Sequence, residues 1–360
     1  MKKLKIGIVG LSRGKGFVNV FSKHPEVEVA ALCDINQTKL AETGKVFNLP
    51  DNSLYLKYDD FVNAPLDVVM IATPIPCHTE QTVKALESGK HVLCEQTVAY
   101  TFKECQKVLE TVRKTKKTYM MAENYCYFHY IRQWKEMIDQ GRLGDVVYAE
   151  AEYIHEIVGL LENKQTGEFF WRADRPPIWY CAHCLGPLLT LMNDRVVKVV
   201  GMHSGFHRFP GRTAKPGFLD MEVGLFHTAK GKVIKILRSQ TPLRPHMVWY
   251  CLYGTKGSVE NGRLHEEGGM LYIPEEMGPE NKAQMSKYSV IDPDAPEEAK
   301  KGGHGTSEYF MIRDFIDAVK NNTRPPIDII RAIDFTVPGI IAHESALAGG
   351  KLMDVPVYWK

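Results

Sequence analysis

The first 124 residues alternate short apolar runs with longer charged segments, and this alternation limits the possible folds more than any other feature. The apolar runs are rich in β-branched residues and read KIGIVG (5–10), VEVAALCD (27–34), LDVVMIATP (66–74), HVLCEQ (91–96) and TYMMAEN (118–124). The segments between them have helical periodicity and include 36–47, 77–89 and 101–116. Strands that alternate with helices of this length form βαβ units and a parallel sheet. We therefore predict a parallel α/β domain over residues 1–124.

The pattern changes after a helical stretch around 129–140. Four strand-like segments follow, at 145–156, 196–205, 221–240 and 247–262. They contain the hairpin-type turns AKGK and GTKG, so we predict a second, α+β domain over 125–360 with a large, mostly antiparallel, open-faced sheet. The polar, Pro- and Gly-rich segment 274–305 is expected to be structureless and either functional or mobile. Helices near 306–320 and 328–348 close the chain and are free to pack back on the first domain.

Composition excludes several classes of partner. The 360 residues fit two packed domains, and a formal net charge of +2 creates no basic field for nucleic acid. No window approaches the roughly 18 uncharged apolar residues of a membrane-spanning helix, and we read the start MKKLKIGIVG as a strand, not a signal peptide. Eight scattered cysteines favour a reducing compartment. We expect a cytoplasmic protein with no membrane partner.

The turn after the first strand, GLSRGKGF (10–17), has part of the glycine pattern of a dinucleotide-binding fold. Gly10 fits the tight turn, and Ser12 replaces the second glycine of the pattern. Gly14 and Gly16 lie on either side of the third glycine position. The strand before this turn and the helix-like segment after it indicate a Rossmann domain.

An acidic residue at the end of the second strand indicates which cofactor is bound. Asp34 follows Gly10 by 24 residues, where a carboxylate accepts hydrogen bonds from both adenosine ribose hydroxyls. We therefore predict NAD as the cofactor. Arg13 and Lys15 in the predicted loop could bind a 2′-phosphate, so NADP is the less favoured alternative.

The run VVMIATPIPCHTEQTVKALESGKHVLCEQ resembles the Gfo/Idh/MocA oxidoreductases. The resemblance is carried by Thr73, Pro74 and His78, and by ALESGKHVLCE, which ends in Glu95. It implies a Rossmann domain followed by an open-faced sheet domain, and oxidation or reduction of sugars and cyclitols. The family typically continues Glu-Lys-Pro, with the lysine as a proposed proton-transfer residue. Here Gln96 takes its place, and a glutamine cannot act as a general base.

Further motifs resemble a subgroup, the NAD-dependent glycosidases typified by alpha-N-acetylgalactosaminidases. They are MAENYCYF (121–128), AEAEYIHE (149–156), FWR (170–172), YCAHCLGP (180–187), GTKG (254–257) and GGHG (302–305). Members of this subgroup oxidise a sugar hydroxyl, eliminate the anomeric substituent, add water and reduce again. Their Tyr-x-His and Tyr-x-x-His motifs line the sugar site, which implies catalytic roles here for Tyr153, His155, Tyr180 and His183.

The remaining candidate site residues come from the glycine turn, from the acid after the second strand and from these resemblances. Those expected at the cofactor are Gly10, Ser12, Arg13, Gly14, Asp34, Thr73, Pro74, His78, Glu95, Gln96 and Asn124. Those expected at the substrate are Tyr125, Trp171, Arg172 and His304. Other interpretations stay open, because His78 could cap a helix, Glu95 could orient backbone, and His304 could be an ordinary loop residue.

Removing hydride from a secondary alcohol requires a base for its hydroxyl proton. His183 is the strongest candidate, because imidazole titrates near neutral pH and Pro187 indicates a helix start close by. A buried structural histidine is the alternative. Tyr153 and His155 lie two apart on a predicted strand, so both face the same side, toward a pocket or toward solvent.

The segment WYCAHCLGP contains a CxxC that could be a redox pair, half of a zinc site or a pocket wall. A zinc site needs about four ligands, and no second CxxC or histidine pair has the usual spacing, so we predict no metal. A helix start could still lower the pKa of Cys181 or Cys184 and make it reactive. We favour the pocket wall, with His183 as its functional residue.

Three functions remain after these observations. The first is an NAD(H)-dependent oxidoreductase that acts on a secondary hydroxyl of a sugar or glycoside. The second is a glycoside hydrolase that recycles NAD through oxidation, elimination, hydration and reduction. The third, which the missing lysine motivates, is a non-catalytic NAD or sugar sensor. An uncovered apolar sheet face also predicts a homo-oligomer formed through the second domain.

Overall fold

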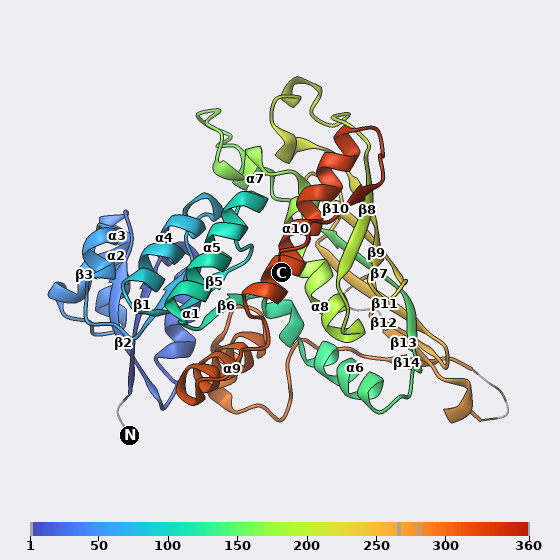
Figure 1. Cartoon of the computed structure of the whole chain (residues 1–360), viewed down its shortest axis with the longest axis horizontal. Coiled ribbons are helices and arrows are strands. Elements are labelled where there is room, and N and C mark those ends of the chain that lie inside the picture. The colour runs from blue at the N-terminus through green and yellow to red at the C-terminus, as the bar shows by residue number, and fades with distance from the viewer. Residues whose placement is uncertain (1–2, 265–267, 279, 281, 359–360) are drawn as a thin grey trace. The chain divides into compact units, whose positions relative to one another are not determined.

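The computed structural model describes residues 3–264, 268–278, 280 and 282–358. The chain forms two compact units, the first of Met1–Phe128 with Val290–Ile333 and the second of His129–Ser289 with Asp334–Lys360 (Figure 1). The sequence predicted a boundary after residue 124 and left the closing helices free to join the first domain. In the described part of the chain, no helix is long and apolar enough to cross a membrane.

The first unit contains a parallel sheet of six strands in the order β3-β2-β1-β4-β5-β6. The strands are β1 (Leu4–Val9), β2 (Val27–Cys33), β3 (Leu54–Tyr55), β4 (Val68–Ile71), β5 (His91–Glu95) and β6 (Tyr119–Ala122). The helices are α1 (Leu11–Phe21), α2 (Gln37–Val46), α3 (Tyr58–Val62), α4 (Ile75–Glu87), α5 (Phe102–Thr115) and α9 (Ser307–Asn321). This order confirms the predicted Rossmann sheet.

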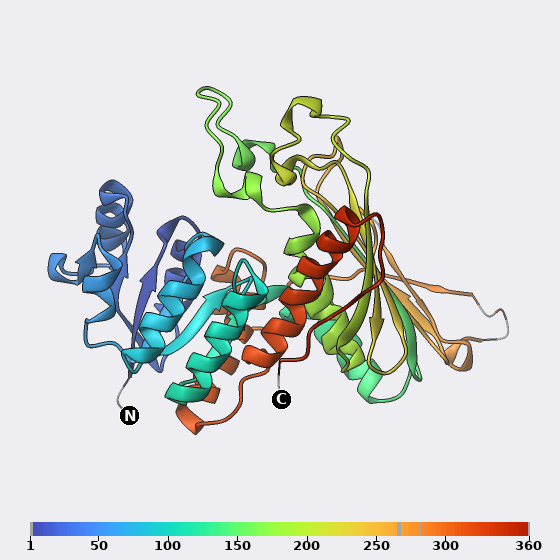
Figure 2. The ribbon, with the colours of Figure 1, turned by 45° about the horizontal axis from the view of Figure 1, so that its top comes forward.

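Helices cover both faces of this sheet. α1 packs against α2 and α9, while α4 packs against α3 and α5. Figures 1 and 2 show α4 and α5 side by side on one face. Every residue of β4 and β6 is buried, as the apolar runs predicted for strands covered on both sides.

The glycine turn is tighter than the sequence indicated. Gly10 has a φ of 87°, and a Cβ there would lie 2.6 Å from the carbonyl oxygen of Ala72, so only glycine fits. Helix α1 begins directly after it at Leu11. The prediction that Arg13 and Lys15 lie in a loop is therefore wrong, because one left-handed residue makes the whole turn.

The second unit contains a sheet of nine strands in the order β14-β13-β12-β11-β7-β10-β9-β8-β15, in which only β7 and β10 pair in parallel. The strands are β7 (Val146–Ile154), β8 (Val196–His203), β9 (Glu222–Thr228), β10 (Val233–Ser239), β11 (Met247–Gly254), β12 (Ser258–Glu260), β13 (Gly269–Tyr272), β14 (Gln284–Ser286) and β15 (Met353–Asp354). Both predicted hairpin turns, AKGK and GTKG, join antiparallel neighbours.

Two helices lie on one face of the large sheet, α8 (Ala182–Met192) and α10 (Ile329–Leu347, from Asp334 onward in this unit) (Figures 1 and 2). The remaining helices near this unit are α6 (His129–Asp139) and α7 (Val158–Leu161). β8 approaches α10 closely, and the amide of Gly201 donates to Ser345 Oγ over 2.9 Å. Residues of the other face include the exposed Met202, Leu225 and Tyr253. The large, mostly antiparallel, open-faced sheet is thus confirmed.

The prediction that 274–305 has no structure is wrong. Strand β14 adds to the sheet edge beside β13, and 3-10 helices form at Pro274–Glu276 and Glu297–Lys301. Strands of three or four residues carry no readable periodicity and therefore could not be predicted from the sequence.

Candidate active site

The nucleotide end of the first unit is organised around Gly10 and Asp34. Asp34 Oδ2 accepts a hydrogen bond from the amide of Leu11 over 2.7 Å, and its Oδ1 accepts one from the amide of Asn36 over 2.8 Å. The carboxylate is buried and still has lone pairs for other donors. The end of β2 is therefore tied to the first turn of α1, where free helix amides favour a phosphate.

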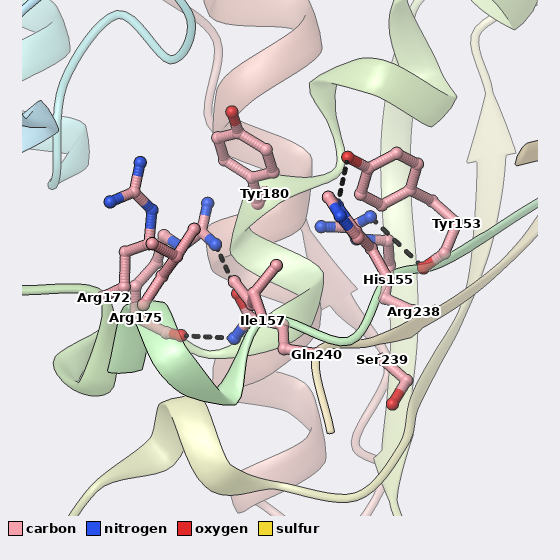
Figure 3. Close-up of a pocket in the computed structure, with 10 residues that line it drawn as sticks. Tyr153, His155, Ile157, Arg172, Arg175, Tyr180, Arg238, Ser239 and Gln240 are labelled. Atoms are coloured by element: carbon pink, nitrogen blue, oxygen red, sulfur yellow. Dashed lines mark hydrogen bonds between the residues drawn. The ribbon is translucent and has the colours of Figure 1, made fainter. Parts of the chain in front are cut away.

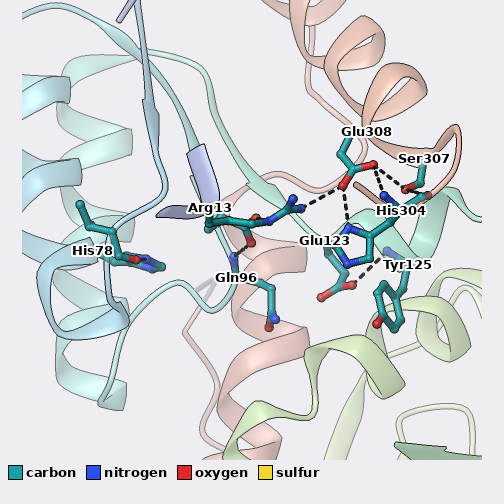
Figure 4. A network of polar contacts seen from close by, with 10 residues as sticks. Arg13, His78, Gln96, Glu123, Tyr125, His304, Ser307 and Glu308 are labelled. Carbon is teal, nitrogen blue, oxygen red and sulfur yellow. Dashed lines mark hydrogen bonds and ion pairs between the residues drawn. The ribbon is translucent and has the colours of Figure 1, made fainter. Parts of the chain in front are cut away.

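Four ionisable side chains form a network beside this turn, and Figure 4 shows Arg13, His304 and Glu308 among them. Arg13 Nε donates to Glu95 Oε1 over 2.7 Å, and Arg13 Nη2 donates to Glu308 Oε1 over 3.0 Å. His304 Nδ1 lies 2.7 Å from the same Glu308 oxygen. Burial alone would raise the pKa of Glu308, but His304 and Arg13 outweigh it and lower that pKa to about 2. Burial alone would lower the pKa of Arg13, but Glu95 and Glu308 raise it.

This network changes what Arg13 can do. Two of its nitrogens donate to carboxylates of the chain itself, so its positive charge is already balanced. Nearby, Lys39 Nζ donates to Ser12 Oγ over 2.5 Å. The sequence did not single out Glu308, which lies at the start of the predicted helix 306–320.

His78 is completely buried and contacts the backbone of two loops. Its Nδ1 lies 2.7 Å from the carbonyl oxygen of Thr97, and its Nε2 lies 2.9 Å from that of Thr73. Burial lowers the pKa of His78 despite these contacts. Thr73 Oγ1 donates to Gln81 Oε1, and Pro74 precedes α4. Both ring nitrogens of His78 therefore face backbone, which favours a structural role.

The segment that replaces the family lysine is also buried. The amide of Gln96 donates to Glu95 Oε2 over 3.2 Å, and the peptide bond between Gln96 and Thr97 is cis. Asn124, directly after β6 and Glu123, is 2% exposed, and within the described residues its Nδ2 has no hydrogen-bond partner. A buried amide donor of this kind needs an acceptor, so Asn124 fits a bound ligand. The ring of Tyr125 lies 6.1 Å from that of His304.

The second unit contains a pocket of about 110 Å³ (Figure 3). It is lined by Tyr153, His155, Ile157, Leu160, Arg172, Arg175, Tyr180, Arg238, Ser239 and Gln240. Tyr153 Oη lies 3.0 Å from His155 Nδ1, so the two residues of the Tyr-x-His motif point into one pocket. His246, which the sequence did not indicate, places its ring 4.2 Å from that of His155.

His155 is uncharged at neutral pH. Burial, followed by the neighbours His246, Arg238, His183 and Arg175, lowers the pKa of His155 to about 4. A neutral imidazole next to a phenol can take a proton from it and return it. The pair can therefore act as an acid–base group.

His183 and Tyr180 lie at the start of α8. His183 is the second residue of α8, and Pro187 lies inside that helix instead of at its first position. The ring of His183 lies 5.2 Å from that of Tyr180 and 5.4 Å from that of Tyr153. His183 is 7% exposed and stands behind these two tyrosines. The structure thus brings all four predicted catalytic residues together.

Arginines stack on aromatic rings in the pocket and beside it. The guanidinium carbon of Arg238 lies 4.1 Å from the ring centre of Tyr153, that of Arg175 lies 3.8 Å from that of Tyr180, and that of Arg172 lies 4.4 Å from that of Trp171. Of these three arginines, only Arg172 was among the site residues expected from the sequence. Arg238 could have been found from strand register, because it pairs with Tyr153 on the neighbouring strand.

The cysteines of WYCAHCLGP are buried free thiols. Cys181 Sγ donates to the carbonyl oxygen of Phe335 over 3.8 Å. In the described ranges, no group of three or more His, Cys, Asp or Glu residues could hold a metal ion.

Two family models together match almost the whole chain. Residues 4–123 match the oxidoreductase family with an NAD-binding Rossmann fold, named GFO_IDH_MocA. Residues 127–360 match the C-terminal domain of glycosyl hydrolase 109. The glycosyl hydrolase family 109 protein of Shewanella putrefaciens strain CN-32 is 27% identical over 379 residues, covering 96% of this chain and 83% of that protein.

Solved structures with the same fold include two sugar or cyclitol dehydrogenases. Levoglucosan dehydrogenase in complex with NADH and L-sorbose has a TM-score of 0.83 and 18% identity, covering 99% of this chain and 100% of that chain. The scyllo-inositol dehydrogenase of Lactobacillus casei with bound NAD(H) and scyllo-inositol has a TM-score of 0.77 and 18% identity, covering 98% of this chain and 99% of that chain.

Proposed function

Because the chain belongs to the glycosyl hydrolase 109 family and has the Rossmann domain of the Gfo/Idh/MocA oxidoreductases, we propose that it is an NAD-dependent enzyme acting on a secondary hydroxyl of a sugar or glycoside. The observation that carries this proposal is a cluster in which Tyr153, His155 and Tyr180 line one pocket. The ring of His183 lies within 5.4 Å of the rings of both tyrosines. A sugar ring offers several hydroxyl groups to such a set of donors and acceptors.

The residues of the first unit fit NAD. Gly10 and the start of α1 would hold the pyrophosphate, Asp34 would accept the ribose hydroxyls, and Asn124 would donate to an acceptor on the cofactor. Bound NAD would supply the hydride acceptor for the alcohol. We favour NAD over NADP, because Asp34 would repel a 2′-phosphate and Arg13 already balances two carboxylates.

Residues of the pocket must carry out proton transfer, since Gln96 has no acid–base function. We propose that the Tyr153–His155 pair removes the hydroxyl proton of the substrate, because His155 lines the pocket and is neutral at pH 7. His183, behind both tyrosines, is the second acid–base group. Ketone formation makes the neighbouring C–H acidic, so a second base would allow a beta substituent to leave.

The match of residues 127–360 to glycosyl hydrolase 109 favours a second candidate function, a glycosidase that recycles NAD. Its net product would be a free sugar without accumulation of NADH. Deuterium from heavy water would enter the sugar at the carbon next to the oxidised one. Hydrolysis that continues after NAD has been stripped would exclude this cycle.

We also propose a homo-oligomer formed through the large sheet, because Met202 and Leu225 on its outer face are 52% and 49% exposed. A cytoplasmic location is supported by eight cysteines that are all free thiols.

The test of the proposed function is a panel of glycosides incubated with NAD. Mass spectrometry would detect keto-sugars or free sugars, and absorbance would detect NADH. The expected result is a keto-sugar with NADH, or a free sugar whose release depends on NAD. A broad panel that gives neither product would refute the proposal.

A further inference from the structure

The pocket of the second unit is strongly positive. Three of its lining residues are arginines, Arg172, Arg175 and Arg238, and all ten lie in the described part of the chain without an acidic residue among them. Several guanidinium groups in one pocket favour an anionic ligand over a neutral one. The surroundings of each arginine indicate which of the three could bind a ligand.

Arg238 lines the pocket and packs against the ring of Tyr153. It is 1% exposed, and its Nε and Nη1 donate to the backbone carbonyl oxygens of Pro177 and Tyr153 over 3.1 Å and 3.3 Å. Its guanidinium lies under the ring of Tyr153. Arg238 therefore orients Tyr153, and two of its nitrogens already donate to backbone carbonyl groups.

Arg172 and Arg175 stand together on another wall. Both guanidinium groups stack near the ring of Trp171, at 4.4 Å and 5.7 Å from its centre. Arg175 also donates to the neutral amide of Gln240. In Figure 3 the two guanidinium groups lie across the pocket from Tyr153 and His155.

Arg172 and Arg13 differ in whether a carboxylate balances their positive charge. Arg13 has two carboxylate partners, and its pKa is raised. For Arg172, burial lowers the pKa and only the tyrosine neighbours Tyr180 and Tyr153 oppose it. No described carboxylate makes an ion pair with Arg172. A cation taken out of water without a counter-charge is costly, and a bound anion would offset that cost.

From this we infer that the pocket takes acidic sugars, with the anionic group held between Arg172 and Arg175 and the ring hydroxyl at Tyr153 and His155. The inference rests on the proposed function, because it names the substrate class of the same site. The shared chemistry is an anionic oxygen cluster on the sugar, either the carboxylate of a uronate or a sulfate ester. Paired guanidinium groups bind both through charge-assisted hydrogen bonds.

The experiment compares matched phenyl glycosides of several hexoses with the NAD-loaded protein. Each neutral glycoside is paired with its 6-carboxylate and its 6-sulfate, and kcat/KM is measured for keto-sugar or phenol release. We expect an acidic member to exceed its neutral partner by about tenfold or more. The larger of the two gains identifies carboxylate or sulfate, and added salt should reduce the gain.

Variants separate recognition of charge from a general loss of function. Arg172→Gln and Arg175→Gln should bring the acidic-to-neutral ratio close to one, while Arg172→Lys should keep part of it. Arg212→Gln, a surface control whose partner is Glu162, should leave the ratio unchanged. The ratio is an internal measure, so partial unfolding of a variant does not affect it.

Equal or better turnover of neutral glycosides would overturn the inference while the proposed function stands. If no glycoside of either kind reacts, the proposed function fails, and calorimetry with methyl glycosides and methyl uronides decides the inference. Tighter binding of the methyl uronides, lost in Arg172→Gln, would support it. Equal binding, or tighter binding of the neutral sugar, would overturn it.

Discussion

At the scale of single residues, the ionisation of His155 decides the chemistry of the pocket. Its pKa is lowered to about 4, so this imidazole stays neutral and able to accept a proton well below pH 6. We predict that kcat/KM is level down to about pH 5 and falls only near pH 4. A pH–rate profile with its acid limb near pH 6.5 would assign the base to another group.

Removal of the same imidazole gives a second prediction. His155→Asn keeps a polar side chain beside Tyr153 but cannot take its proton. We expect kcat to fall by about 10²–10⁴-fold while NAD binding is unchanged, since that binding site lies in the other unit. Stopped-flow kinetics and calorimetry measure the two effects. His207→Asn, an exposed histidine outside the pocket lining, is the control and should leave both values intact.

Asp34 gives a third prediction at the residue scale. Asp34→Asn replaces one carboxylate oxygen with a donor and removes the negative charge at the ribose site. We expect the Kd for NAD to rise by about tenfold and the preference for NAD over NADP to shrink. Titration of both cofactors tests this, with the exposed Asp51→Asn as control. An unchanged preference would mean that Asp34 does not contact the ribose.

At the scale of elements, Glu308 on α9 joins Arg13 on α1, which in turn joins Glu95 at the end of β5. The pKa of Glu308 is lowered to about 2, below its ordinary value, so its contribution to stability is present at neutral pH. That contribution is lost as the pH falls below the ordinary carboxylate range toward 2.

We therefore predict that Glu308→Gln lowers the free energy of unfolding at pH 7 by up to about 3 kcal/mol, because it leaves Arg13 with one partner. The variant should also show a weaker loss of stability between pH 5 and 3, roughly the range in which the native carboxylate is protonated. Chemical denaturation at several pH values measures both. Glu297→Gln, whose partner Lys300 is also at the surface, is the control and should change little.

The elements also show where sequence reasoning succeeds and where it stops. The long apolar strands and amphipathic helices of the first unit were readable, because burial on two faces leaves a continuous pattern. The residue at which α1 begins could not be predicted, because one glycine at positive φ takes the place of the longer loop that we expected. β3 and β14 were too short to carry a period.

The candidate site was readable only where a motif marked it. Tyr153, His155, Tyr180 and His183 came from motifs, and the structure brings them together. Arg175 and Arg238 carry no motif and reach the pocket through strand register and a 3-10 turn. Such residues become visible only once the pairing of strands is known.

At the scale of the whole molecule, the outer face of the large sheet leads to a prediction about assembly. Met202 and Leu225 are apolar and half-exposed on neighbouring strands. We expect a homo-oligomer in solution that dissociates when both are replaced by aspartate. Light scattering after size exclusion measures the mass, with Leu347→Asp as control. A wild-type monomer would contradict the proposed interface.

We propose above all that this protein transfers a hydride from a sugar carbon to NAD. The most direct test uses glycosides that carry deuterium at a single ring carbon, mixed with the NAD-loaded protein and quenched rapidly. Mass spectrometry of the cofactor should find deuterium from one ring position in the nicotinamide, whether the net reaction is oxidation or hydrolysis. Substrate that is turned over with no deuterium in the cofactor from any ring position would contradict the claim.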